Sequence, residues 1–389
     1  MPKDLYRVLI TQFLTAFADN AVLFTAITMV MVNTGVGSWY IPALQAAFLV
    51  AFVMLGPWVG RFADAYPKPK VLLVANIIKG AGAVLLIMGV EPLLAFVVIG
   101  LGAALYSPAK YGILPELVDS QLLVKANGWI EGSTIVAILA GTLAGAALSE
   151  YSVNLALLLV LVLYIASAVV ARLVTHSHVV GKPQGPALQG FVVQMKGLLA
   201  TPRARFATLG VSLFWSAATV LRLLLVAWAP VVLLMTSTTD IALLTMFVAL
   251  GIAVGAVLVP KLIPMAYLRR ARLAAYGMGL VIVALSMVGD VWVARLALFM
   301  AGVCGGLFVV PINAALQEIG HKTIGSGGAV AIQNFFENFA MLLASGAYAL
   351  IAGTGVDPVA TMIWLGALVV ILTLLVSWRL PKDTGNLQG

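Results

Sequence analysis

The sequence predicts an all-α membrane protein with twelve spanning helices in two halves of six. Of its 389 residues, 62% are hydrophobic and only 9% are charged, and the mean hydropathy is +1.10. Apolar runs of about 20 residues, the length that crosses a bilayer as a helix, recur along the whole chain. Backbone polar groups inside a bilayer must bond to one another, so runs of this length and composition predict helices.

Polar interruptions set the boundaries of the expected spans. We place the spans at residues 7–32, 41–60, 71–90, 92–110, 126–148, 153–173, 206–234, 240–260, 272–289, 291–311, 325–352 and 358–378. The longest interruption, 174–205, is rich in Gly, Pro and basic residues and separates six spans from six. It predicts an N-terminal six-helix bundle (1–173), a cytoplasmic linker (174–205), and a C-terminal six-helix bundle with a short cytoplasmic tail (206–389).

The two halves share weak internal similarity. The fourth and tenth spans end near Pro108 and Pro311, and a glutamate follows each proline, Glu131 after 23 residues and Glu337 after 26. Two six-helix pseudo-repeats joined by a cytoplasmic linker are the layout of many secondary transporters. Small residues at Gly141 and elsewhere predict close helix crossings rather than chemistry. These small residues are Gly141, Gly145, Gly251, Gly255, Gly302, Gly305 and Gly306.

Most of the basic residues lie on one side of the predicted membrane spans. The net charge is +8, and 19 of the 22 Lys and Arg residues fall at the two termini or in the loops on their side. The short loops on the other side instead carry Glu91, Glu150, Asp240, Asp290 and Asp357. Positive residues remain in the cytoplasm, so both termini are expected there, and nucleic-acid binding is excluded as the reason for the charge. The three other bases, in spans or at an edge, are Lys79, Arg222 and Arg295.

Catalytic and metal-binding patterns are missing from the sequence. Cys304 is the single cysteine, and the histidines His176, His178 and His321 fall in polar connections. No G-x-x-x-x-G-K-[ST] loop is present to hold a nucleotide. We therefore expect no enzyme, no cofactor and no metal site, and the His176/His178 pair is interpreted as an ordinary loop.

Charged residues within the spans are the main functional signals, because an intramembrane charge is costly. At about 1.5 Å per residue, Asp19 lies near the midplane of the first span, Arg222 beyond the midplane of the seventh, and Glu337 near the middle of the eleventh. One interpretation is structural: Asp19 or Glu337 neutralises Arg222 or Lys79. The other is functional: opposite charges on the two halves face a shared cavity and bind a substrate that carries both signs.

One loop motif resembles a superfamily signature. The stretch GRFADAYPKPK follows the second span and is similar to the Gly-x3-Asp motif of major facilitator superfamily transporters. Gly60 and Asp64 match, and Lys68 and Lys70 supply bases, whereas Ala65 and Pro67 replace the usual base and glycine. A carboxylate near a helix N-terminus is stabilised by the helix dipole, so Asp64 is expected to latch the inward-closed state.

Longer stretches resemble one family within that superfamily. FADNAVLF, AALYSPAKYGILPEL, VKANGWIEGSTIVAILAG, LFWSAATVLRLLLV, VVPINAALQE and AIQNFFENFAMLL look like the bacterial lysophospholipid transporters, over nearly the whole chain. The resemblance implies a multi-pass protein of the bacterial inner membrane. It also implies flipping of lysophosphatidylethanolamine and other lysophospholipids from the outer to the inner leaflet by alternating access, without ion coupling. A cytosolic acyltransferase/acyl-carrier-protein synthetase would then restore the missing acyl chain.

A lysophosphatidylethanolamine carries an ammonium, a phosphate and one acyl chain. We expect Asp19, helped by Asn20, to receive the ammonium and Arg222 to hold the phosphate, with Glu337 and Asn338 completing the polar site. The acyl chain would lie among Met and Phe residues of the C-terminal half, which also suit ordinary helix packing and lipid contact. The expected gating or charge-network residues are Arg61, Asp64, Lys68, Lys70, Lys79, Lys110, Glu116 and Glu131.

Two other functions fit part of the pattern. A proton-coupled exporter of lipophilic drugs would use Asp19 as its protonation site. A non-transporting membrane subunit that recruits the acyltransferase would have no reason to carry intramembrane charges.

Overall fold

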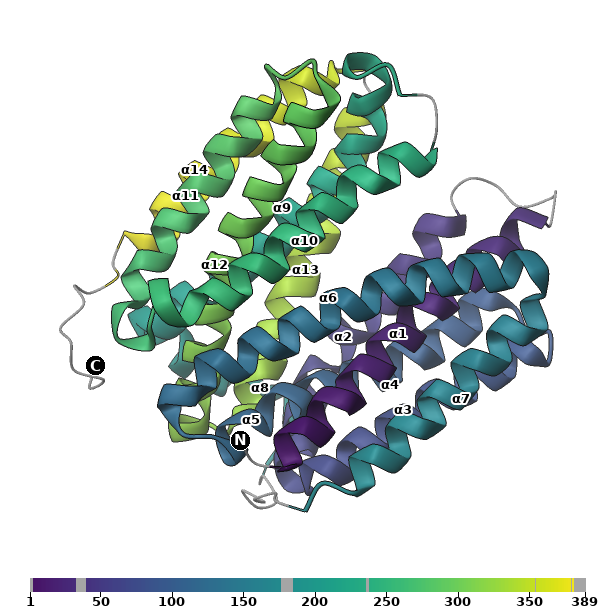
Figure 1. Ribbon diagram of the computed structural model, residues 1–389. Helices are drawn as coiled ribbons and strands as arrows, with labels where there is room; N and C mark the ends of the chain where they lie inside the picture. The colour runs from purple at the N-terminus through teal and green to yellow at the C-terminus, as the bar shows by residue number, and fades with distance from the viewer. Residues whose placement is uncertain are drawn as a thin grey trace. The chain divides into compact units, whose positions relative to one another are not determined.

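The computed structural model describes residues 3–32, 40–175, 185–235, 238–353, 355–378 and 380. His176, His178, Lys182, Arg379 and Lys382, on which part of the sequence interpretation rests, lie outside these ranges. The described chain is helical throughout, as the sequence predicted (Figure 1). Its long helices are α1 (Lys3–Val32), α2 (Tyr40–Ala65), α3 (Lys68–Ile87), α4 (Pro92–Gly112), α6 (Ser120–Tyr151), α7 (Val153–Arg172), α9 (Pro202–Val232), α10 (Thr238–Leu262), α11 (Ala271–Leu285), α12 (Val291–Thr323), α13 (Ser326–Gly353) and α14 (Pro358–Ser377).

Each of these twelve helices matches one expected span. Eleven helices in the described residues are long and apolar enough to cross a membrane. The remaining one, α11, has 15 residues and follows a 3-10 turn, η1 (Met265–Arg270). It ends at Leu285, before the expected residue 289, and the Ser286 hydroxyl donates to the Val283 carbonyl just beyond that end.

The helix α12 corrects one expected boundary. The sequence placed its end at Pro311, but α12 continues to Thr323. An interior proline removes one backbone donor without ending a helix that is packed on all sides. Prolines also lie inside α2, α4, α9 and α10, at Pro57, Pro108, Pro230 and Pro260.

Two shorter helices were not expected from the sequence. The first, α5 (Leu114–Leu117), is a single turn that follows α4. The second, α8 (Ala187–Ala200), lies within the segment interpreted as a linker. Phe191 and Leu198 of α8 are buried, whereas Val193 and Lys196 are exposed. The 3.6-residue period of ALQGFVVQMKGLLA is the signal that would have identified this helix.

Contacts divide the chain into two compact units. Unit 1 comprises Met1–Ser120, Ser133–Gly197 and Gln317–Asn338, and unit 2 comprises Gln121–Gly132, Leu198–Leu316 and Phe339–Gly389. The end of α12 and the start of α13 therefore pack within unit 1, although they come from the second half of the sequence. The start of α6 likewise packs within unit 2. The expected division into bundles 1–173 and 206–389 follows the order of the chain and remains a prediction.

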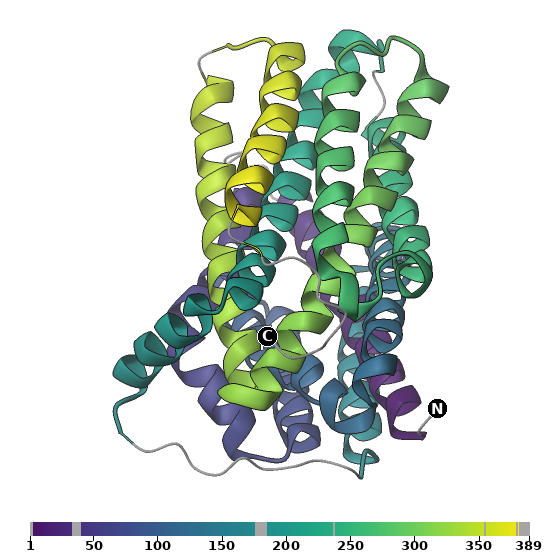
Figure 2. The same cartoon turned by 90° about the vertical axis from the view of Figure 1, so that its left-hand side faces the viewer.

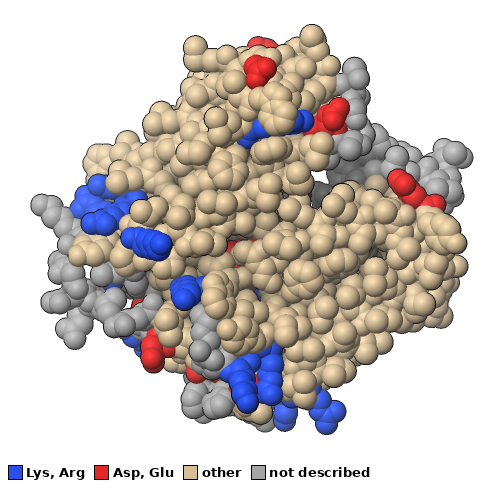
Figure 3. All heavy atoms as spheres, viewed as in Figure 1, with Lys and Arg blue, Asp and Glu red and all other residues tan. Residues whose placement is uncertain are grey.

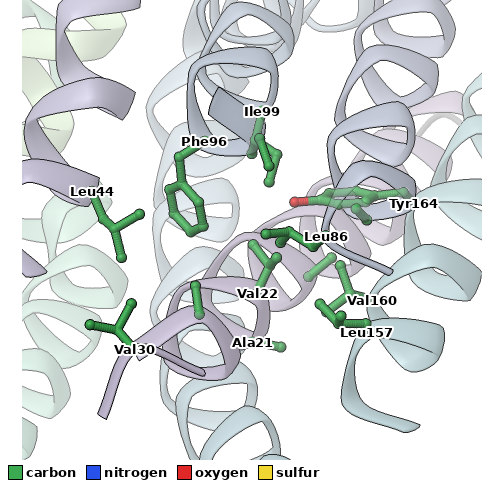
Figure 4. Close-up of a cluster of buried hydrophobic side chains, with 14 of the residues drawn as sticks. Ala21, Val22, Val30, Leu44, Leu86, Phe96, Ile99, Leu157, Val160 and Tyr164 are labelled. Carbon is green, nitrogen blue, oxygen red and sulfur yellow. The ribbon is translucent and has the colours of Figure 1, made fainter. Parts of the chain in front are cut away.

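Within unit 1, α3 packs against α4 and α7, α2 against α4, and α1 against α7. Figure 4 shows a cluster of buried side chains among these helices, including Val22, Leu86, Phe96, Val160 and Tyr164. The helix α6 lies on α1 at glycines: a Cβ at Gly141 would overlap the Phe17 carbonyl. The expected close crossing at Gly141 is therefore confirmed.

Within unit 2, α14 packs against α9 and α11, with α14 yellow in Figure 2. The helices α10 and α12 approach so closely that a Cβ at Gly251 would overlap the Phe299 carbonyl, and one at Gly302 would overlap the Val248 carbonyl. The expected glycine-mediated crossing is confirmed here too. The face in Figure 3 consists mostly of uncharged residues with a few separate charged patches, as expected of helices in contact with lipid.

Candidate functional site

The Asp19 carboxylate of α1 forms a buried ion pair with Lys79 of α3. The Lys79 ammonium lies 2.8 and 3.0 Å from the two carboxylate oxygens, and the Tyr164 hydroxyl of α7 donates to Asp19 at 2.8 Å. The Lys79 side chain is 1% exposed and that of Asp19 is 21% exposed. Lys79 also lies 4.8 Å from the ring centre of Tyr106 on α4. Four helices of unit 1 thus converge on this pair.

Gly102 of α4 leaves room for the Lys79 side chain, because a glycine has no Cβ. A Cβ at Gly102 of α4 would lie 2.7 Å from the Lys79 Cγ atom. The lysine side chain therefore runs along the bare backbone of α4 to reach Asp19. A buried charge of this kind is tolerated only when it is paired.

A second polar cluster lies about one turn along the same three helices. The Thr15 hydroxyl donates to the Asn76 side-chain oxygen at 3.0 Å and lies 2.7 Å from the Ser167 hydroxyl. Ser167 in turn donates to the Thr11 carbonyl. Sequence reasoning missed Tyr164, Thr15, Asn76 and Ser167. Their signal was spacing, because Thr15 precedes Asp19 by four residues, and Asn76 precedes Lys79 by three, which places each pair on one helix face.

Arg222 of α9 stands in contrast to Asp19. Its side chain is exposed among apolar neighbours, and no hydrogen bond or ion pair joins it to any residue that the structure describes. Asn20, by comparison, donates to the Ala16 carbonyl of its own helix at 2.8 Å. Among the described residues, unit 1 therefore holds a neutralised ion pair, and unit 2 holds a guanidinium without a counter-charge in contact with it.

The Asp64 carboxylate binds the N-terminus of α13. Its two oxygens accept hydrogen bonds from the backbone N–H groups of Gly327 at 2.9 Å and Gly328 at 2.8 Å. The carboxylate is buried, and the two N–H groups are among those that a helix N-terminus leaves without an internal partner. The geometry combines two charge-assisted hydrogen bonds with the positive end of the helix dipole.

Glycines at the start of α13 allow the Asp64 carboxylate to approach the helix backbone this closely. A Cβ at Gly327 would lie 2.7 Å from an Asp64 oxygen, and Gly325 has a φ of +90°, which favours glycine. One turn further along α13, a Cβ at Gly60 of α2 would lie 2.7 Å from the Ala331 Cβ. The start of α13 is therefore seated directly on the end of α2.

Two further charges extend the Asp64 contact. The Lys68 ammonium lies 2.5 Å from the Glu116 carboxylate and 3.8 Å from that of Asp64. All three side chains are buried. Lys70, in the same motif, is exposed. We define Asp64, Lys68, Glu116, Gly327 and Gly328 as the α2–α13 latch.

The other expected residues occupy separate places. Lys110 is buried with its ammonium 4.0 Å from the ring centre of Tyr111, and the Asn313 amide lies 3.4 Å from the Glu131 carboxylate in unit 2. On α13, Asn338 bonds back to the Asn334 carbonyl, and Glu337 is half-buried.

The helix α8 covers part of the latch end of unit 1. Its Phe191 ring packs edge-on against Phe335 of α13, with 5.6 Å between ring centres. Arg61 of α2 donates to the Gly185 carbonyl at 2.9 Å, just before α8 begins. A mostly apolar groove of about 470 Å³ lies alongside; its lining residues are Trp58, Val59, Arg61, Phe62, Ala65, Tyr66, Leu105 and Ala187.

Comparisons with known proteins agree with this arrangement. Residues 8–345 match the Major Facilitator Superfamily model. The chain is 40% identical over 384 residues to the lysophospholipid transporter LplT of Photorhabdus laumondii, covering 97% of this chain and 96% of that one. It is 41% identical over 370 residues to LplT of Klebsiella pneumoniae, covering 94% and 93% of the two chains. This chain belongs to the lysophospholipid transporter family of the major facilitator superfamily.

Solved structures support the fold alone. An outward-facing bacterial homologue of the iron transporter ferroportin aligns with a TM-score of 0.77 at 15% identity, covering 97% of this chain and 100% of that one. The Escherichia coli fucose:proton symporter also aligns with a TM-score of 0.77, at 12% identity, covering 97% and 98%. Identities this low identify the architecture and leave the substrate to the family relationship.

Within the lysophospholipid transporter family, the pairing of Asp19 is the detail that the sequence left open. Both Lys79 and Arg222 were candidate partners, and the described residues place Lys79 against it. The substrate and gating roles expected of the thirteen residues named from the sequence remain predictions, which the geometry above now makes specific.

Proposed function

We propose that this protein transports lysophospholipids from the outer to the inner leaflet of the bacterial inner membrane by alternating access. The observation that carries the proposal is Arg222, a guanidinium in an apolar helix with no hydrogen-bond or ion-pair partner among the described residues. A planar guanidinium in low dielectric binds a phosphate strongly, and an apolar helix suits an acyl chain. The names of the relatives supply the lipid class.

Asp19 would receive the ammonium of the head group, but under a constraint. A carboxylate has about four acceptor sites, and three hydrogen bonds already reach Asp19 from Lys79 and Tyr164. The substrate ammonium therefore takes the remaining site, or displaces Lys79, which carries the same chemical group. Glu337, Asn338 and Asn20 would complete the polar surface.

The α2–α13 latch would close the cytoplasmic end. Opening there requires Asp64 to release the Gly327 and Gly328 N–H groups and α8 to release Phe335. A charge-assisted hydrogen bond contributes about 1.5–3 kcal/mol, so two of them bias the closed state without making it permanent. Lys110 and Glu131 would take part in the same rearrangement, and Arg61 and Lys70 would border it.

A proton-coupled drug exporter is less well supported. Such a transporter uses a carboxylate that is free to lose and gain a proton, whereas both oxygens of Asp19 already accept hydrogen bonds from the buried Lys79 ammonium, and one also accepts from the Tyr164 hydroxyl. In our proposal the net drive is removal of the product by a cytosolic acyltransferase/acyl-carrier-protein synthetase, because a ligand bound equally well at both faces moves toward the side that consumes it.

The experiment is transport of labelled lysophosphatidylethanolamine into proteoliposomes, with and without a pH gradient. We expect the same rate in both conditions. A rate that disappears when the gradient is collapsed would support the exporter instead, and lack of transport under either condition would overturn the proposal.

A further inference from the structure

Arg295 is a basic residue on the side of the membrane where the sequence otherwise places acidic residues. It lies near the start of α12, four residues after Val291 and so about 6 Å into the helix. Asp290 caps this end, and its carboxylate accepts from the N–H groups of Trp292 and Val293 at 2.9 and 3.0 Å. The Asp290 carboxylate thus caps the helix, and no carboxylate in the described residues forms an ion pair with Arg295.

Two aromatic rings hold the Arg295 guanidinium. Its central carbon lies 4.6 Å from the Trp292 ring centre and 5.7 Å from the Phe247 ring centre. Phe247 belongs to α10, which the glycine contacts fix against α12. The buried Nε atom of Arg295 has no hydrogen-bond partner among the described residues. The aromatic contacts orient the group without neutralising its charge.

The chemistry of such a group selects its ligand. The edge of a guanidinium presents paired N–H donors whose spacing matches two oxygens of a phosphate. At this depth, near the boundary between head groups and acyl chains, the available phosphates belong to lipids. Trp292 is 70% exposed beside it and offers an amphipathic surface to the glycerol and upper acyl chain.

Arg295 and Arg222 lie at different expected depths in the membrane. Both belong to unit 2. Arg222 lies ten residues, or about 15 Å, from the end of α9 at the expected outer side, so Arg295 is the nearer of the two to that side. A phosphate that enters from the outer leaflet therefore meets Arg295 first.

We propose that Arg295, held between Trp292 and Phe247, is an outer docking site for the lysophospholipid phosphate before it reaches Arg222. This inference rests on the proposed function. The competing role is an anchor that binds any head group and only fixes the depth of α12, as interfacial Trp and Arg residues commonly do.

Kinetics of lysophosphatidylethanolamine uptake distinguish the two roles. Arg295→Ala is expected to raise the half-saturating lipid concentration about tenfold, the effect of losing one charge-assisted contact, and to leave the maximal rate within about twofold. Trp292→Ala should act in the same direction. Trp364→Ala is the matched control, because Trp364 of α14 is similarly exposed at 72% and no arginine of the described residues stacks on it.

Arg295→Gln provides a second variant if the alanine variant does not fold, because it keeps most of the side-chain volume and removes the charge. An unchanged half-saturating concentration in a folded variant would overturn the inference. A fall in maximal rate alone, or an equal effect of Trp292→Ala and Trp364→Ala, would identify an anchor. Wild-type protein that moves no lysophosphatidylethanolamine would overturn the proposed function instead.

Discussion

The Lys79 ammonium lies 2.8 Å from the Asp19 carboxylate, and the Tyr164 hydroxyl donates to the same group. A carboxylate at mid-depth of a membrane helix is thereby compensated within one unit of the protein. The pair explains how the chain tolerates Asp19. It also constrains any role of Asp19 in binding, because a substrate ammonium must share the carboxylate with a lysine.

Removing one member of this pair should destabilise the protein. Lys79→Met leaves an uncompensated carboxylate, and Asp19→Asn leaves a fully buried ammonium, so each should lower the free energy of unfolding by about 3–5 kcal/mol. Thermal unfolding in detergent checks the prediction. Lys70→Met, at an exposed lysine, is the control and should leave the melting temperature unchanged. A Lys79→Met variant as stable as the wild type would contradict the pairing.

Neutralising Asp64 should loosen the latch. In Asp64→Asn one acceptor oxygen becomes an NH2 donor, so one of the two N–H bonds from Gly327 and Gly328 is lost and the other loses its charge assistance. We therefore expect lysophospholipid uptake to fall about tenfold or more. A cysteine placed at the buried Val330 position in a Cys304→Ala background should react faster with a maleimide.

The control for Asp64→Asn is Asp357→Asn, which removes the charge of a helix cap on α14 outside the latch but keeps an oxygen that can accept from the Val359 N–H. Unchanged maleimide reactivity in Asp64→Asn would show that Asp64 does not hold this end closed.

Adding one methyl group at Gly327 should also loosen the latch. Gly327→Ala places a Cβ where the Asp64 carboxylate and the Ala63 Cβ now lie, at 2.7 and 3.0 Å, so the latch must separate. Gly346→Ala on the same helix is the matched control, because its Cβ would meet nothing within 4 Å. It should be neutral or stabilising by up to about 1 kcal/mol. Equal uptake by both variants would refute the close-approach requirement.

Head groups should separate the roles of Arg222 and Asp19. Arg222→Ala is expected to reduce uptake of lysophosphatidylethanolamine and lysophosphatidylglycerol alike, by about tenfold or more, because both carry a phosphate. The melting temperature should hold, since Arg222 has no partner among the described residues. Asp19→Asn should affect the ethanolamine lipid more, because only that head group has an ammonium. Because Asp19→Asn is also expected to be less stable, uptake is compared per folded protein, and equal sensitivity of the folded variant to both lipids would remove the role assigned to Asp19.

The sequence was informative where one rule dominates. Bilayer thickness fixes helix length, so each of the twelve long helices was predicted, eleven of them long and apolar enough to cross a membrane, and the glycines at 141, 251 and 302 marked close crossings correctly. It failed at Pro311, where tertiary packing overrides a local helix breaker. It also failed at α8, whose short amphipathic pattern lies in a segment otherwise typical of a linker.

The site was harder to predict than the fold. Charge in an apolar run identified Asp19, Lys79 and Arg222, but sequence carries no information on which helices adjoin, so the partner of Asp19 stayed open. Tyr164 and Ser167 were missed because a hydroxyl in a membrane helix is common and becomes significant only beside a charge. The latch was partly visible, since the Gly-x3-Asp motif marked Asp64 but not Gly327 and Gly328.

The most direct test of the account is lysophosphatidylethanolamine uptake by the double variant Asp19→Asn, Lys79→Met. Removing both charges at once restores a neutral, buried environment, so stability should return close to that of the wild type. If Asp19 also binds the substrate ammonium, uptake stays low although the protein is folded. Uptake restored to the wild-type rate would show that Asp19 and Lys79 serve only to neutralise each other, and would contradict the account.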